Sequence, residues 1–86
     1  MKLFGEELKQ DGCTSRWTHG GYYVVIDQLS LVEIDCFVKG GGLEDTITKQ
    51  FVLVGEARRW VEQTIRADVY RTCRAVKLPG FDAGKE

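Results

Sequence analysis

The chain has 86 residues, enough for one domain with a thin core, and its formal net charge at pH 7 is −1. Its composition, 43% hydrophobic and 29% charged, is typical of a folded protein and excludes a disordered chain. A charge this close to zero also excludes a whole-molecule attraction to nucleic acid or to an anionic membrane. We therefore expect residues 1–86 to form a single small domain.

The cysteines indicate the compartment. Cys13, Cys36 and Cys73 are odd in number and widely spaced, which is not the pattern of a disulfide framework and suits a reducing environment. The chain contains no run of ~18 apolar residues, so we expect no membrane-spanning segment. Its first twelve residues contain no apolar run of signal-peptide length. These features predict a cytoplasmic protein.

The N-terminal residues allow two interpretations. Leu3, Phe4 and Leu8 have the spacing of a short helix that Gly12 caps at its C-terminal end. Residues 2–4 also fit an edge strand. Asp11-Gly12 indicates a turn in either case.

Three strands are predicted next. The first covers residues 16–26 and is interrupted at Gly20-Gly21, where paired glycines indicate a bulge. The second covers residues 31–38, whose even-numbered residues are apolar and face the core, while Glu33 and Asp35 face water. A loop at residues 40–42, Gly-Gly-Gly, leads to the third strand at residues 47–54. This loop lacks the strand-to-helix context of a phosphate-binding loop.

A long C-terminal helix is predicted after Gly55. Apolar and small residues recur there at steps of three and four, at Ala57, Trp60, Val61, Thr64, Ile65, Val69, Cys73 and Val76. The sequence at 78–80, Leu-Pro-Gly, supplies a stop, and residues 79–86 are expected to form a flexible tail. Asp68 falls on the apolar stripe, where a charged side chain is not expected. The alternative is a helix that ends near Arg66, with residues 69–77 as a fourth strand.

The predicted fold is therefore α+β: a three-stranded antiparallel β-meander packed against one C-terminal α-helix. In this arrangement Trp60, Val61 and Ile65 lie against the apolar residues of the second strand, which are Val32, Ile34 and Cys36.

No pattern of reactive residues indicates catalysis. Cys13, His19, Cys36 and Cys73 include no C-x-x-C pair, so we expect neither a metal site nor a cofactor. His19 is the only histidine and therefore the only candidate base for a cysteine nucleophile. A small-molecule site or a weak enzyme around His19 and the tyrosines is therefore ranked third among three functional hypotheses. The first two, which are binding functions, follow.

Aromatic residues support the first hypothesis, a non-catalytic interaction module. One helix covers only one face of the sheet, so some aromatic side chains of the strands are expected on the uncovered face. The predicted contact residues are Trp17, Tyr22, Tyr23 and Phe37. For a chain this small the expected partner is a second copy, giving a homodimer. In size and style the chain is similar to the orphan proteins of phages, plasmids and gene cassettes.

The second hypothesis is nucleic-acid binding by the helix. Residues 56–77 hold six Lys/Arg against three Asp/Glu, including Arg58, Arg59, Arg66, Arg71 and Arg74. From Tyr22 to Ile65 the order of elements, with Phe51, Glu56, Ala57 and Trp60, resembles small sheet-reading DNA-binding domains of the plant and phage-integrase arm types. Those domains present basic residues and tryptophan from the strand face, where this chain has Glu33 and Asp35. Any phosphate contacts are therefore expected from the helix.

Overall fold

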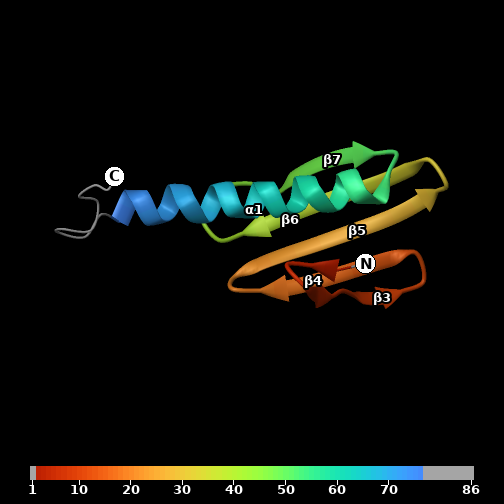
Figure 1. Cartoon of the computed structure of the whole chain (residues 1–86), viewed down its shortest axis with the longest axis horizontal. Coiled ribbons are helices and arrows are strands. Elements are labelled where there is room, and N and C mark those ends of the chain that lie inside the picture. Colours follow the sequence, from red (N-terminus) through yellow and green to blue (C-terminus); the bar gives the residue numbers. More distant parts are fainter. Residues whose placement is uncertain (1, 77–86) are drawn as a thin grey trace.

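The computed structural model describes residues 2–76, with side chains through residue 73. The elements in chain order are β1 (Lys2–Leu3), β2 (Glu6–Glu7), β3 (Lys9–Asp11), β4 (Thr14–His19), β5 (Tyr22–Ser30), β6 (Glu33–Gly40), β7 (Ile47–Phe51) and α1 (Val54–Val76). Figure 1 shows α1 lying over β6 and β7 and running nearly along them. The predicted stop at residues 78–80 and the tail at 79–86 lie outside the described residues.

Strands β3 to β7 form one antiparallel sheet in which each strand pairs with its neighbours in the chain, and β1 and β2 form a separate two-stranded sheet. One C-terminal helix packed on a sheet is confirmed, but the three-stranded meander is wrong. The strand count differs because the expected first strand is two strands, β4 and β5, and because the N-terminal residues contribute β3.

Gly20 and Gly21 form a turn, and the predicted bulge is wrong. Both have positive φ angles, 60° and 88°, and His19 pairs with Tyr22 directly across them. Two residues with positive φ between paired strands give the type I′ hairpin turn, in which glycine is preferred. The two glycines therefore reverse the chain.

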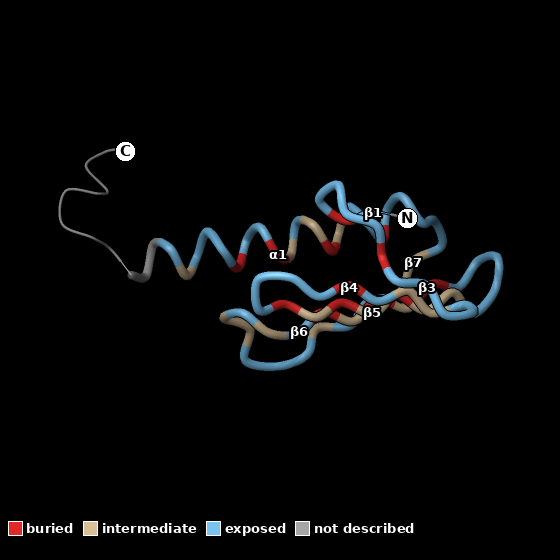
Figure 2. Tube along the Cα trace, turned by 90° about the horizontal axis from the view of Figure 1, so that it is seen from below, coloured by how far each residue is buried: buried red, intermediate tan, exposed pale blue. Residues whose placement is uncertain are grey.

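The N-terminal residues form a β-hairpin, so the predicted short helix is wrong. The hairpin turns at Phe4-Gly5, where Phe4 has a φ of 51°, a value uncommon for a residue with a side chain. Leu3 and Leu8 are buried. Figure 2 shows β1 and α1 on the same side of the large sheet, so the hairpin covers part of the inner face beside the helix.

Strand β6 has the predicted alternation. Ile34, Cys36 and Val38 are buried, whereas Glu33 is exposed and Asp35 is half-buried. The strand begins two residues later than predicted, at Glu33. Val32 consequently lies in the turn before β6 and is 62% exposed instead of facing the core.

The single long helix is confirmed, since α1 runs from Val54 to Val76 and residues 69–76 form no strand. The Leu53 carbonyl accepts the first helical bond, from the Ala57 N–H at 3.1 Å. The inward residues are Ala57, Val61, Ile65 and Asp68. Trp60 is half-buried and lies beside Phe51, with a ring-centroid distance of 5.6 Å.

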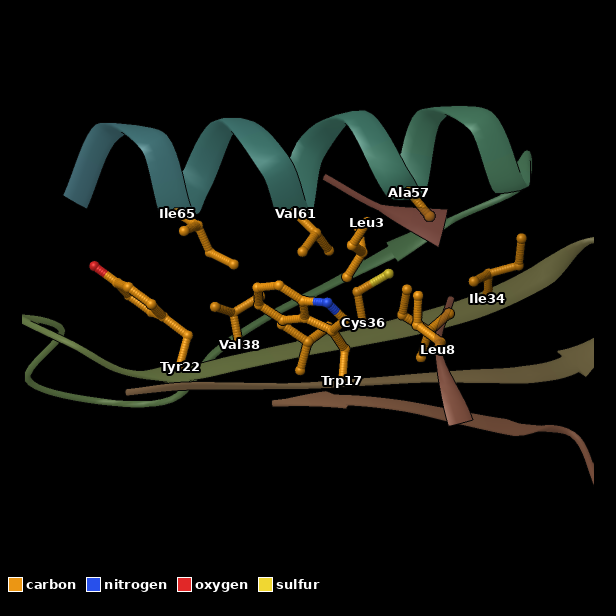
Figure 3. Close-up of a cluster of buried hydrophobic side chains, with 12 residues drawn as sticks. Leu3, Leu8, Trp17, Tyr22, Ile34, Cys36, Val38, Ala57, Val61 and Ile65 are labelled. Carbon is orange, nitrogen blue, oxygen red and sulfur yellow. The ribbon is translucent and has the colours of Figure 1, made fainter. Parts of the chain in front are cut away.

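The core lies between the inner face of the sheet and the layer made by α1 and the β1–β2 hairpin (Figure 3). The sheet contributes Trp17, Tyr22, Val24, Ile26, Ile34, Cys36 and Val38. In Figure 3 the Trp17 indole rises from β4 toward the helix. Burial of these side chains, at about 1.5–3 kcal/mol for each large apolar residue, is the main stabilisation of the fold.

Candidate functional site

A buried carboxylate links the helix to two segments of the sheet. Asp68 is 2% exposed and accepts hydrogen bonds from the Tyr22 hydroxyl, from the Arg71 guanidinium and, at 2.8 Å, from the Gly42 N–H. Arg71 also donates to the Gly42 carbonyl at 3.2 Å. A buried charge is costly unless it is paired and hydrogen-bonded, and both oxygens of Asp68 are engaged. We call these four residues the Asp68 network.

The network shifts two pKa values in opposite directions. The hydrogen bond from Tyr22 is the largest cause of the lowered pKa of Asp68, and it outweighs the opposing effect of burial. Burial raises the pKa of Tyr22 to about 12, and the hydrogen bond to Asp68 adds to this shift. At neutral pH the network therefore holds an ionised carboxylate and a protonated tyrosine.

The three glycines at residues 40–42 are close-packed and do not form a free loop tip. A Cβ at Gly40 would overlap the Gly21 carbonyl, and a Cβ at Gly41 would overlap the Tyr22 ring. A Cβ at Gly42 would overlap the Thr72 methyl group. The absence of side chains at these three glycines therefore allows close packing against β5 and α1.

Beside the network, a cleft of about 350 Å³ opens between the hairpin, the β4–β5 turn and α1. Its side chains include Phe4, Trp17, Tyr22 and Ile65, together with Glu6 and His19. We call it the aromatic cleft. The ring centroids of Phe4 and Trp17 are 5.7 Å apart, and the imidazole of His19 stacks on Trp17 at 5.8 Å.

Glu6 is the acidic residue of the cleft. Its Oε1 accepts a hydrogen bond from Trp17 Nε1 at 3.0 Å and lies 3.6 Å from His19 Nδ1. The side chains of Glu6 and His19 are 52% and 65% exposed, so both are accessible to a ligand. His19, Trp17 and Tyr22 were among the candidate residues predicted from the sequence, whereas Phe4 and Glu6 were not, because the position of the N-terminal hairpin was not predictable.

The predicted contact residues lie on opposite faces of the sheet. Trp17 and Tyr22 are in the core, 6% and 7% exposed. Tyr23 and Phe37 lie on the outer face and are half-buried. Phe37 sits opposite Val25, and the Lys39 ammonium lies 5.2 Å from the Tyr23 ring. Figure 2 shows the helix and hairpin on the other side.

A larger apolar surface lies elsewhere. Six aliphatic residues around the β5–β6 turn and the β7–α1 connection are 39–92% exposed: Leu29, Leu31, Val32, Val52, Leu53 and Val54. Figure 1 shows both connections at one end of the sheet, and Val32 and Val52 line a common hollow of about 390 Å³. We call these six residues the apolar end. Leu31, Val32 and residues 52–54 were predicted to lie in strands, so this cluster was not predicted.

The arginines predicted to contact phosphates are not equivalent. Arg58 and Arg59 are exposed. Arg71 belongs to the Asp68 network, and the Arg66 guanidinium lies 5.1 Å from the Phe4 ring. The side chain of Arg74 lies outside the described ones. Two of the five are thus engaged within the protein.

The cysteines are free thiols. Cys13 and Cys73 are exposed, and Cys36 is buried, which raises its pKa to about 11. Among residues 2–76 no three His, Cys, Asp or Glu side chains are grouped to hold a metal ion. Within the same range, no helix has the length and apolar character required to cross a membrane.

Comparison with known proteins gives no match to a family model, to a curated protein or to a solved structure. Functional inference therefore depends on the surfaces described above.

Proposed function

We propose that this protein is a small, non-catalytic interaction module that forms a homodimer through its apolar end. The observation that carries the proposal is the exposure of six aliphatic side chains at one end of the sheet, with Leu31 92% exposed. Exposed apolar clusters on soluble proteins often mark contact surfaces, and Val32 and Val52 of this set line one hollow. Burial of each leucine contributes about 1.5–3 kcal/mol when it leaves water completely.

The charges beside the apolar end favour a second copy as the partner. Glu33, Lys49 and Glu56 line the same hollow as Val32 and Val52. In a two-fold interface contacts occur in reciprocal pairs, so that if one residue contacts a second residue of the other copy, the reverse contact is also made. A rim that carries both signs is then self-complementary, because Lys49 of one copy can pair with Glu33 or Glu56 of the other.

The outer face of the sheet is the weaker candidate for this contact. Its aromatic residues, Tyr23 and Phe37, are half-buried within the monomer, and Lys39 lies near the Tyr23 ring. Less apolar area is therefore left to bury there. The proposal keeps the predicted self-association and transfers it to the apolar end. Free thiols at Cys13 and Cys73 also favour the cytoplasm as its location.

Light scattering tests the proposal. A homodimer has twice the chain mass of 9.7 kDa. Leu31→Asp should shift the protein toward monomer and weaken association by at least about tenfold, because a charge replaces a buried leucine in both copies. Thr18→Asp is the matched control, since it adds the same charge to the outer face beside Tyr23.

Two results would contradict the proposal in different ways. A wild-type protein that is monomeric at ~100 µM lacks a specific interface of standard size, which ends the self-association hypothesis. A dimer that Thr18→Asp dissociates, while Leu31→Asp leaves it intact, would assign the contact to the outer face instead of the apolar end.

A further inference from the structure

The aromatic cleft lies away from the apolar end. It adjoins the β4–β5 turn, whereas the apolar end surrounds the β5–β6 turn, and Figure 1 shows these two turns at opposite ends of β5. Self-association through the apolar end would leave the cleft open. Its function can therefore be considered independently of the dimer.

We propose that the aromatic cleft binds a small organic ammonium ion, such as a quaternary amine. Its volume of about 350 Å³ falls within the range of small-molecule sites. Three aromatic rings line it, of which Phe4, 36% exposed, is the most open, while Trp17 and Tyr22 are 6% and 7% exposed. Aromatic ring faces attract cations, tryptophan most strongly, and aromatic cages are a common means of recognising quaternary ammonium groups.

The charge of the cleft favours a cation over an anion. Glu6 supplies a carboxylate, and no lysine or arginine lines the cleft itself. The nearest cation is the Arg66 guanidinium over the Phe4 ring, and Glu62, four residues before Arg66, brings an opposing charge to the same place. The positive charge of Arg71 is paired with Asp68. Glu6 is thus the carboxylate that lies within reach of a ligand in the cleft.

The cleft is held in shape without a ligand. The Trp17 indole fixes Oε1 of Glu6, and the backbone N–H of Phe4 donates to Glu62 Oε2 at 2.9 Å. Phe4 keeps an unfavourable positive φ in this position. The Phe4-Gly5 turn holds Phe4 in this conformation, because both residues have positive φ and Leu3 pairs with Glu6 directly across them, as in a type I′ hairpin turn. A site that is already ordered loses less entropy when a ligand binds.

Titration with choline chloride, followed by amide and indole NMR, tests this proposal against a sodium chloride control of equal ionic strength. The Trp17 indole N–H should shift saturably, with an affinity in the millimolar range expected for so small a ligand. The Trp60 indole, which lies beside Phe51, is an internal control and should not move. The neutral carbon analogue 3,3-dimethyl-1-butanol should bind about tenfold more weakly, because it lacks the charge.

Glu6→Gln should weaken choline binding about tenfold and leave the analogue unaffected, since glutamine retains an oxygen for the Trp17 indole. Glu33→Gln, which removes the same charge far from the cleft, should leave both affinities unchanged. Equal binding of choline and the analogue would overturn the proposal in favour of an apolar site. No saturable Trp17 shift by ~50 mM choline would overturn it as well. Neither result bears on the oligomeric state, which light scattering reports.

Discussion

Replacing Tyr22 by phenylalanine removes one hydroxyl from the Asp68 network and leaves the ring in the core. Asp68 keeps the Gly42 N–H and the Arg71 guanidinium as donors, so the carboxylate is not left unpaired. A hydrogen bond to a charged group contributes about 1.5–3 kcal/mol. We therefore expect Tyr22→Phe to lower the free energy of unfolding by about 1.5–3 kcal/mol at pH 7.

The pH dependence gives a second magnitude, to which burial of Tyr22 and its hydrogen bond to Asp68 both contribute. The folded state raises the pKa of Tyr22 from 10.0 to about 12. The contribution of protonated Tyr22 to the free energy of unfolding is therefore complete below pH 10 and is lost as the pH rises toward 12. A shift of this size corresponds to roughly 2–3 kcal/mol. Because this loss is close to the effect of the mutation, the stabilities of wild type and Tyr22→Phe should converge near pH 12.

Urea unfolding of both proteins at several pH values measures the effect. Tyr23→Phe, the same chemical change on the outer face of the same strand, is the control and should cost less than about 0.5 kcal/mol. The reasoning fails if the two variants are equally stable. It also fails if the difference between wild type and Tyr22→Phe is unchanged from pH 8 to pH 12.

Three further predictions concern single positions. Gly42→Ala should lower the free energy of unfolding, measured in urea, by about 1–3 kcal/mol, because the added Cβ would overlap the Thr72 methyl group. A decrease of less than about 0.5 kcal/mol would contradict this close packing. The folded state lowers the pKa of Asp68 below its ordinary value of 3.8, so the ionised carboxylate stabilises the fold above pH 3.8, and this stabilisation is lost as the pH falls through the folded-state pKa. The free energy of unfolding of the wild type, measured at decreasing pH, should therefore show a loss that Asp68→Asn lacks. Asp35→Asn should stabilise the fold by about 0.2–1 kcal/mol at pH 7, because Asp35 lies directly opposite Asp27, and no gain in thermal unfolding would argue against this repulsion.

The parts of the fold that were predictable from sequence have a regular period. The alternation at Ile34, Cys36 and Val38 gave the inward face of β6, and steps of three and four gave α1. The Gly20-Gly21 turn was not predictable in the same way. A one-residue bulge and a two-residue hairpin turn both shift the inward positions from odd numbers, as at Trp17, to even numbers, as at Tyr22. Only the pairing of the strands distinguishes them.

The candidate sites depend on contacts that are distant in sequence. Asp68 was conspicuous as a charge on the apolar stripe, but its donors come from β5, 46 residues away, and from the β6–β7 loop, 26 residues away. The aromatic cleft required the position of the N-terminal hairpin. Short segments such as β1 and β2, with two residues each, carry too little periodicity to predict where they pack.

Tyr22 connects the Asp68 network with the aromatic cleft. Its ring lines the aromatic cleft, and its hydroxyl is held by Asp68, so the network that stabilises the fold also fixes one wall of the cleft. The apolar end surrounds connections at the other end of the sheet. Tyr22→Phe should therefore leave the dimer dissociation constant unchanged at concentrations where the variant is folded, and any effect on binding should be confined to choline. A dimer weakened in parallel with folding would mean that the two ends are energetically coupled through α1.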